Sequence, residues 1–351
     1  MLLNENFWKD KKVFITGHTG FKGSWLTIWL KLLGAETYGF SLDKPSEKNL
    51  YEEANVNSLT ASTTGDIRNI ALLKKSLSDF NPDLIFHLAA QPLVRFSYLD
   101  PITTYETNVI GTLNLLEASR QLKNLCAVVN VTTDKCYENN EQKDGFKETD
   151  PMGGFDPYSN SKACSELVSS CYFQSFYQTE KIGLATARSG NVLGGGDWAQ
   201  DRLLPDLFRA YENQHTLKIR NPNSTRPWQH VLEPLAGYLL LAERLYEEPL
   251  RWSESWNFGP EAEDAKEVGW IVNFVSDQLE ITEKWETDKT DNPHEANFLH
   301  LNIEKAKKEL GWYPKWNLAE SLNKVVEWNV YYQNGSSALD LCRNQIKEYQ
   351  E

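Results

Sequence analysis

The sequence predicts an α/β protein, with a Rossmann-type doubly wound parallel sheet followed by a smaller C-terminal substrate-binding α/β lobe. Short apolar runs alternate with helical periodicity through the first half of the chain, as expected for parallel strands joined by helices. Each run is nearly continuous, as in a sheet covered on both faces. A glycine-rich turn stands between the first run and the first helix. At roughly 150 residues per domain, the 351 residues suggest two domains.

The elements follow one another in a regular order along the first half. A third strand is expected to end at the TTGDIRN stretch. The other expected strands are 12–16 (KVFIT), 37–42 (TYGFSL), 84–90 (LIFHLAA), 127–133 (AVVNVTT) and 182–188 (IGLATAR). Helical periodicity marks 24–34, 67–80, 101–123 and 156–178.

The regular alternation of apolar runs and helical periodicity ends after Arg188, where glycine-rich and loop-forming stretches begin. We therefore expect residues 1–188, with a returning segment near 229–258, to form the nucleotide-binding domain. Residues 189–228 and 259–351 are expected to form the substrate-binding lobe. The tail after QNGSS is expected to be a docked helix.

Composition excludes several classes of function. The net charge of −13 argues against non-specific binding to nucleic acid or anionic membranes. Five cysteines without a CxxC pair fit a reducing compartment, and the six histidines show no metal-binding spacing. The N-terminus carries charges where a signal peptide needs an apolar core, and no stretch approaches the ~20 apolar residues of a membrane helix. These features predict a cytoplasmic protein without a metal.

The glycine-rich turn is typical of a dinucleotide site. Gly17, Gly20 and Gly23 allow a tight turn and close approach of a pyrophosphate, and the N-terminus of the following helix offers free N–H groups. Asp43 follows the second strand, where a carboxylate accepts hydrogen bonds from a ribose and repels a 2′-phosphate, which favours NAD. The neighbouring Lys44 leaves NADP open.

Two further pairs of residues carry chemistry. Tyr158 and Lys162 are four apart, so they lie on one face of a helix, where the cation can lower the pKa of the phenol. Asp134 and Lys135 come directly after a strand that ends in two threonines. They place an acid and a potential base side by side at the carboxyl end of the sheet.

With these motifs the chain resembles the extended short-chain dehydrogenase/reductase family, and within it the nucleotide-sugar 4,6-dehydratases. The likeness extends over most of the chain. It rests on TGHTGFKG, GDIR, HLAAQP, TNVIGT, TTDK, YSNSK, ARSGNVLGGGDW and RPWQHVLEPLAGYL. GHTGFKGSW, AAQPLVR, TTDKCY, PMGGFDPYSNSK and NPNSTRPWQHVLEP are most similar to the subgroup that acts on CDP-glucose.

The resemblance implies a dehydration that uses NAD transiently. Tyr158 takes the C4 hydroxyl proton while the C4 hydride goes to NAD+, with Thr133 hydrogen-bonded to the same oxygen and Lys162 holding the ribose. Water is then lost across C5 and C6, and the hydride returns to C6. The product would be a CDP-4-keto-6-deoxyhexose, a precursor of 3,6-dideoxyhexoses in bacterial surface polysaccharide such as O-antigen.

The elimination pair departs from the dTDP-glucose relatives, which have Asp and Glu where this chain has Asp134 and Lys135. We expect Lys135 to remove the C5 proton and Asp134 to assist loss of the C6 hydroxyl. A lysine needs burial and nearby positive charge to be neutral. The alternative is that Lys135 stays cationic and stabilises the enolate.

The resemblance also assigns binding residues and a partner. A homodimer is implied, formed by a four-helix bundle from the helices near 101–122 and 157–177, with a tetramer left open. The substrate side is expected to include Gln91, Arg95, Thr133, Asn191, Arg202, Arg220, Arg226 and His294. The cofactor side is expected to include Gly17, Thr19, Gly20, Phe21, Lys22, Gly23, Asp43, Asp66, Ile67, Leu88, Ala89, Ala90, Gln91, Asn108, Thr132, Tyr158 and Lys162.

Three other functions remain to be weighed against this one. A dehydratase of another nucleotide hexose, or a nucleotide-sugar 4-epimerase, would use the same glycine turn and the Tyr158–Lys162 pair. An epimerase needs no elimination pair, so Asp134 and Lys135 favour dehydration. A regulator that only senses NAD(H) would not need Thr133, Tyr158 and Lys162 together.

Overall fold

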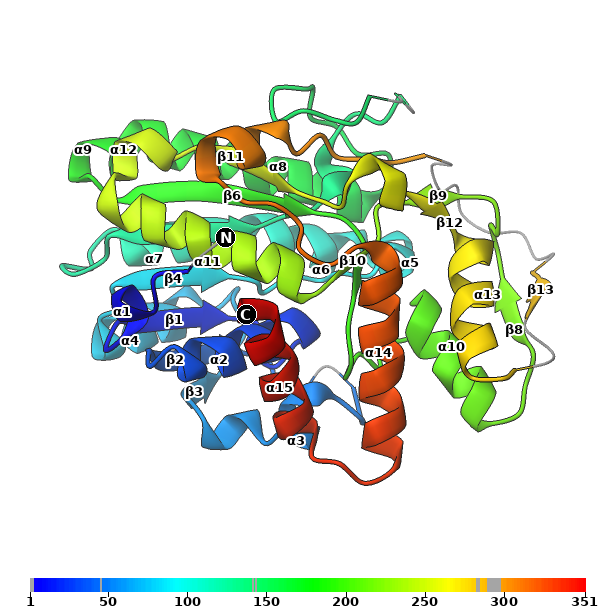
Figure 1. Cartoon of the computed structure of the whole chain (residues 1–351). Helices are drawn as coiled ribbons and strands as arrows, with labels where there is room; N and C mark the ends of the chain where they lie inside the picture. Colours follow the sequence, from blue (N-terminus) through cyan, green and yellow to red (C-terminus); the bar gives the residue numbers. More distant parts are fainter. Residues whose placement is uncertain (1–2, 45, 141, 143, 282–284, 289–297) are drawn as a thin grey trace.

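The computed structural model describes residues 3–44, 46–140, 142, 144–281, 285–288 and 298–351. Its centre is a seven-stranded parallel sheet, which confirms the doubly wound fold (Figure 1). In spatial order the strands are β11 (Ser255–Phe258), β6 (Gly183–Ser189), β5 (Ala127–Val131), β4 (Leu84–His87), β1 (Lys12–Thr16), β2 (Glu36–Ser41) and β3 (Ala61–Thr64).

The five apolar runs predicted to be strands are strands in the structure. The runs predicted at 84–90 and 127–133 leave the sheet earlier than expected, at His87 and Val131. In both cases the last residues of the run line the cavity described below instead of continuing the ladder. β11, which was expected only as a returning segment, pairs in parallel with β6.

Alternate side chains of the strands enter two different cores, because successive residues of a strand point to opposite faces. In β1, Val13 and Ile15 belong to a cluster with helices α2 (Phe21–Leu32), α11 (Leu232–Glu247) and α15 (Ala338–Gln350). Phe14 belongs to a cluster with α4 (Ile70–Phe80) and α7 (Gly111–Ser119). Both clusters are closed to solvent. The sheet is therefore covered on both faces, as the apolar runs predicted.

The helices around the sheet include two long ones that are interrupted by a π-helical turn. Their bounds are α1 (Glu5–Trp8), α2 (Phe21–Leu32), α3 (Leu50–Glu53), α4 (Ile70–Phe80), α5 (Val94–Leu99), α6 (Pro101–Tyr105), α7 (Gly111–Ser119), α8 (Pro157–Tyr172), α9 (Gln178–Glu180), α11 (Leu232–Glu247), α12 (Pro249–Trp252) and α15 (Ala338–Gln350). The π turns, Glu106–Ile110 and Phe173–Tyr177, fall within the segments predicted as continuous helices.

A smaller group of elements lies beside the sheet (Figure 1, right). Its apolar cluster joins α10 (Leu203–Glu212), α13 (Val268–Gln278) and part of α14 (Leu318–Gln333). Short two-stranded pairs complete it: β7 (Val192–Leu193) with β10 (Gln229–His230), β9 (Thr225–Arg226) with β12 (Lys266–Glu267), and β8 (Leu217–Ile219) with β13 (Trp285–Thr287).

The tail after QNGSS forms α15, as expected. Its buried residues Cys342, Ile346 and Tyr349 belong to the same core cluster as Trp29 of α2. The two-lobe division stays a prediction, and the packing adds that the last helix rests on the sheet domain. Among the described residues, no helix has the length and apolarity needed to cross a bilayer.

Candidate active site

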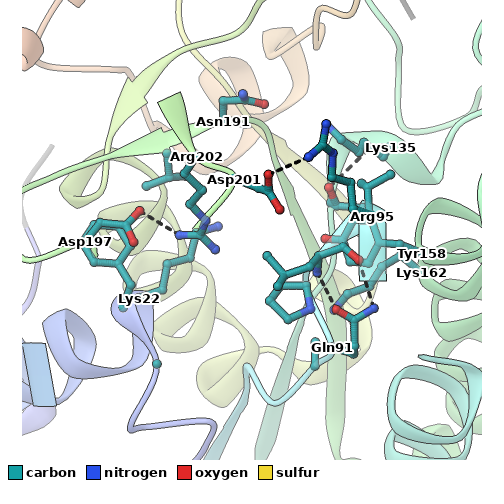
Figure 2. Close-up of a pocket in the computed structure, with 18 of the residues that line it drawn as sticks. Lys22, Gln91, Arg95, Lys135, Tyr158, Lys162, Asn191, Asp197, Asp201 and Arg202 are labelled. Carbon is teal, nitrogen blue, oxygen red and sulfur yellow. Dashed lines mark hydrogen bonds and ion pairs between the residues drawn. The ribbon is translucent and has the colours of Figure 1, made fainter. Parts of the chain in front are cut away.

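A cavity of about 1020 Å³ opens at the carboxyl ends of the sheet strands, between the sheet and the smaller group of elements (Figure 2). The glycine turn after β1, the ends of β4 and β5, the start of α8 and the loop before α10 all contribute to its wall. Ligands of doubly wound sheets bind at this edge because loops from neighbouring strands diverge there.

The glycine turn is shaped to accept a dinucleotide. A Cβ atom at Gly23 would lie 2.2 Å from the Gly17 carbonyl oxygen, and one at Gly17 would lie 2.7 Å from the Ala89 backbone nitrogen. Gly17 also has a φ of +75°, which L-residues rarely adopt. The backbone is therefore bare where the N-terminus of α2 meets the cavity, which fits the pyrophosphate of NAD.

The predicted adenosine end of this site is lined by Asp43, Asp66 and Ile67. Lys44 is paired with Glu52 at 3.2 Å, so its charge is partly compensated. The hydrogen bonds of Arg68 lower the pKa of Asp66 and keep it a carboxylate. Two carboxylates and a compensated lysine fit an unphosphorylated ribose better than a 2′-phosphate.

The segment after β5 turns sharply, and its residues Thr133, Asp134 and Lys135 line the cavity. Thr133 begins a 3₁₀ turn, Asp134–Cys136, and its hydroxyl donates to Asp134 Oδ1 at 3.0 Å. The other oxygen of Asp134, Oδ2, is buried and has no hydrogen-bond partner among the described residues. Lys135 is half-buried and lines the same cavity. The turn thus offers one free carboxylate oxygen and one amine to a bound ligand.

Tyr158 and Lys162 enter from the first turns of α8, which begins after the Asp156 N-cap. Burial raises the pKa of Tyr158 to about 12, against the hydrogen bond from Thr133 and the charge of Arg202, which lower it. Burial lowers the pKa of Lys162 to about 8, against the charge of Glu166, which raises it. The pKa of the phenol is therefore raised, not lowered as expected, and the groups that oppose this rise are Thr133 and Arg202 instead of Lys162.

Lys22 is the most strongly perturbed amine of the cavity. Its Nζ donates to Ser189 Oγ at 2.7 Å, and it lies in the wall with Arg202 (Figure 2). Burial, followed by the charges of Arg202 and Lys162, lowers the pKa of Lys22 to about 7. The cavity floor is therefore electropositive, which suits an anionic ligand.

Two arginines at the cavity are held by aspartates of one loop. Arg202 Nη1 lies 2.8 Å from Asp197 Oδ2, and Arg95 Nη1 lies 3.1 Å from Asp201 Oδ1 (Figure 2). Arg226 is buried and donates to the Thr225 carbonyl at 3.0 Å. These guanidinium groups are suited to phosphate oxygens, which they can bind through two parallel hydrogen bonds.

The predicted site residues gather in this one cavity with two exceptions. Asn108 lies behind the wall, where its amide accepts from the Gln91 backbone N–H at 2.8 Å and donates to the Gln91 carbonyl at 3.1 Å. It positions Gln91, which does line the cavity. His294 lies outside the described residues. The roles of the individual residues stay predictions.

Sequence reasoning missed several groups that complete the site. Asp197 and Asp201 hold the two arginines, and Trp228 and Lys218 line the cavity. The signal for the aspartates was present in DWAQDR, where two aspartates and an arginine follow the glycines within six residues. Glu166, buried behind the wall, stands one helical turn after Lys162 and could have been noticed by that spacing.

Comparisons with known proteins agree with this geometry. A family model described as GDP-mannose 4,6 dehydratase matches residues 14–325. A CDP-glucose 4,6-dehydratase of Salmonella typhimurium is 50% identical, with 99% of this chain and 98% of that protein covered. A human dTDP-D-glucose 4,6-dehydratase is 26% identical, with coverage of 91% and 89%.

Solved structures share the fold at lower identity. UDP-glucose 4-epimerase of Thermotoga maritima superposes with a TM-score of 0.81 at 22% identity, covering 92% of this chain and 99% of that one. A dTDP-glucose 4,6-dehydratase of Streptomyces venezuelae, solved with NAD bound, has a TM-score of 0.79 at 24% identity, covering 93% and 99%. Because the family model matches most of the sequence and a dehydratase shares half of it, the chain belongs to the GDP-mannose 4,6-dehydratase family.

Proposed function

We propose that the protein is an NAD-dependent CDP-glucose 4,6-dehydratase, a hydro-lyase that forms CDP-4-keto-6-deoxy-glucose. The observation that carries this proposal is the 50% identity to a CDP-glucose 4,6-dehydratase over nearly the whole of both chains. The cavity supports this proposal, because the Tyr158–Lys162 pair and the Asp134–Lys135 pair both line it, together with the glycine turn. An epimerase would not need the second pair.

NAD would be held by the glycine turn of Gly17, Gly20 and Gly23, and it would supply reversible hydride transfer for the oxidation at C4 and the reduction at C6. The chain's own residues move the protons. Tyr158 takes the proton of the C4 hydroxyl as the C4–H bond breaks, and Thr133 donates a hydrogen bond to the same oxygen. Lys162, one helical turn beyond Tyr158 and with a pKa of about 8, is mostly protonated at pH 7, so its ammonium can donate to the ribose of the cofactor.

The 4-ketone acidifies C5, so the elimination needs one base and one acid. Lys135 removes the C5 proton, and the electron pair of that C–H bond forms the C5–C6 double bond. The C6 hydroxyl leaves as water with a proton from Asp134, whose Oδ2 has no competing partner among the described residues. Hydride addition at C6 and return of a proton to C5 complete the product.

The electropositive side of the cavity binds the nucleoside diphosphate. Arg202 and Arg226 are suited to its phosphates, while Asn191, Gln91 and Arg95 border the sugar. Binding releases part of the ion pairing between Arg95 and Asp201, which are both about two-fifths exposed. Exposed pairs of this kind stabilise the protein by under ~1 kcal/mol, so the hydroxyl groups of the bound sugar can compete for Arg95.

The enzyme acts as a homodimer formed by α6–α7 and α8. These neighbouring helices expose apolar side chains that a monomer would leave in water: Ile102 is 71% exposed, Leu167 is 60% exposed and Ile110 is 45% exposed. A four-helix bundle with a second copy would bury them. We place the enzyme in the cytoplasm, in the route to 3,6-dideoxyhexoses of surface polysaccharide.

The test is turnover of CDP-glucose carrying deuterium at C4, with catalytic NAD+, followed by NMR of the sugar. Deuterium at C6 of a 4-keto-6-deoxy product is the expected result. A C4-epimerised hexose would make the protein an epimerase. Turnover of dTDP- or GDP-sugars without turnover of CDP-glucose would keep the mechanism and change the nucleotide.

A further inference from the structure

A buried carboxylate behind the cavity wall accepts hydrogen bonds from three parts of the sheet: the segment after β5, strand β6 and strand β11. Glu166, on α8, is 4% exposed. Its Oε1 accepts from Arg188 Nε at 2.9 Å and from the Thr132 hydroxyl. Its Oε2 accepts from Arg188 Nη2 at 2.8 Å, from Thr186 Oγ1 at 2.6 Å and from Ser255 Oγ at 3.1 Å. Charge-assisted bonds of this number make the group a rigid junction.

The junction holds both flanks of the segment that presents the elimination pair. Thr132, immediately before Thr133, is bonded to Glu166. Tyr137, just after the 3₁₀ turn, accepts from Arg188 Nη1 at 2.7 Å and donates to Asn257 at 2.7 Å. The Glu166–Arg188 pair therefore clamps the chain on each side of residues 133–136.

The same carboxylate lies on the helix that carries the Tyr–Lys pair. Glu166 is one turn beyond Lys162 and two turns beyond Tyr158. It thus ties the helix with the C4 chemistry to the strand end with the C5–C6 chemistry. Misplacement of catalytic groups by about 1 Å can lower a rate by about 100-fold, so such a tie has a kinetic consequence.

Glu166 also acts on the charge of Lys162. Burial lowers the pKa of Lys162, and Glu166 is the larger of the two influences that raise it. The other titratable groups that interact with Lys162 are Lys22 from α2, His87 from β4 and Cys136 from the turn. Burial raises the pKa of the Cys136 thiol well above its usual value, so that thiol is neutral. Glu166 therefore supplies negative charge that keeps Lys162 protonated.

We propose that Glu166 and Arg188 are a positioning pair for the reaction, which fixes residues 133–135 against Tyr158 and Lys162 and supports the positive charge of Lys162. This inference rests on the proposed function for its kinetic part. Its structural part, the clamp and the charge, can be measured without any substrate.

The kinetic test compares three substitutions around the same carboxylate. Thr132→Val removes the bond to the catalytic segment, Thr132→Ser keeps it, and Thr186→Val removes a bond to β6 away from the segment. We expect kcat for CDP-glucose to fall about 10- to 100-fold in Thr132→Val, with KM for CDP-glucose and for NAD changed less than about threefold. Thr132→Ser should recover most of the kcat that Thr132→Val loses, and Thr186→Val should stay within about threefold of the unchanged enzyme.

The substrate-free test uses amide hydrogen exchange and NMR. Peptides that span residues 132–137 should exchange faster in Thr132→Val than in Thr186→Val. In protein with ¹⁵N-labelled lysine, the Lys162→Met variant identifies the NMR signal of Lys162. Glu166→Gln should lower the pKa of Lys162 by about one unit or more, because the negative charge one helical turn away is lost. Melting curves confirm that each variant is folded.

Equal kcat in Thr132→Val and Thr186→Val, or equal exchange of residues 132–137 in both, would overturn the clamp. An unchanged Lys162 pKa in folded Glu166→Gln would overturn the charge role. If the unchanged protein does not turn over CDP-glucose, the proposed function fails, but the exchange and NMR results still decide the positioning pair.

Discussion

At the scale of single residues, Lys135 has two competing roles, base or enolate-stabilising cation, and two substitutions separate them. Lys135→Met removes both the amine and the charge, whereas Lys135→Arg keeps the charge but cannot supply a neutral base. If Lys135 is the base, both variants lose about 10²- to 10⁴-fold in kcat, the usual contribution of a general base. NMR in D₂O should then show no solvent deuterium entering C5 of the 4-keto intermediate. Full exchange in Lys135→Met, or recovery of activity in Lys135→Arg, would contradict the base role.

The free oxygen of Asp134 depends on Gly190, which directly follows β6, the strand next to β5. A Cβ atom at Gly190 would lie 2.9 Å from Asp134 Oδ2 and 2.5 Å from Pro227 Cγ. Gly190→Ala should therefore displace Asp134 and lower kcat about 10- to 100-fold, as a shift of about 1 Å does. Steady-state kinetics checks this. Gly335→Ala is the control: it has a φ of +90° but open space, so it should cost about 1 kcal/mol of unfolding free energy and no activity.

At the scale of elements, the exposed apolar face of α8 predicts the oligomeric state. Burial of a leucine stabilises an interface by about 1.5–3 kcal/mol, and an arginine there would leave a charge unpaired. Leu167→Arg should therefore shift a dimer toward monomer in light scattering coupled to size-exclusion chromatography. Leu250→Arg, at a residue of α12 that is 54% exposed, should leave the mass unchanged. A monomer in the unchanged protein would refute the proposed interface.

The strands of the sheet, and the site residues at their carboxyl ends, could be predicted because apolar runs and short motifs are visible within a few consecutive residues. The run 12–16 was placed without error, and the acid–base pair after 127–131 lies in the cavity as expected. The π-helical turn at Glu106–Ile110 could not be predicted, because its residues have ordinary helical periodicity. It carries Asn108, whose bonds to Gln91 and Ser161 depend on tertiary packing.

Ion pairs between residues far apart in the sequence were the second feature that could not be predicted. Arg188 and Glu166 are both charged residues in apolar surroundings, which suggests a buried partner for each, but their spacing of 22 residues is not diagnostic. Arg95 and Asp201 are 106 residues apart and come from different parts of the fold. Only the doubly wound sheet brings such residues together, so the sequence predicted the cavity's catalytic wall better than its ion pairs.

At the scale of the whole molecule, two buried carboxylates on α11 fasten the ends of the chain. Glu233 accepts from the backbone N–H groups of Lys315 and Trp316 and from the Tyr349 hydroxyl. Glu243 accepts from the Trp8 indole at 2.7 Å. Burial raises the pKa of each carboxyl to about 7, against these hydrogen bonds, which lower it.

These carboxyls make stability depend on pH in a defined direction. A group whose folded pKa exceeds its unfolded value binds more protons when folded, so its contribution is complete below about pH 4.5 and is lost as pH rises to about 7. The buried histidines act in the opposite direction. Burial lowers the pKa of His18 to about 4 and those of His87 and His230 to about 3, so their stabilisation is lost as pH falls below 6.5. The two groups oppose each other between pH 4.5 and 6.5.

A difference measurement isolates the carboxyl, because Glu233→Gln leaves the histidines in place. Urea unfolding at one protein concentration, at pH 5, 6, 7 and 8, gives the free energy of unfolding of both proteins. The advantage of the unchanged protein over Glu233→Gln should shrink by on the order of 1–3 kcal/mol from pH 5 to pH 8, since a shift of one pKa unit corresponds to about 1.4 kcal/mol. Lost bonds to Lys315 or Trp316 would add only a constant offset. A difference that stays constant across this range would show that Glu233 remains ionised, held by its three donors, and that the fastening of α15 is insensitive to pH.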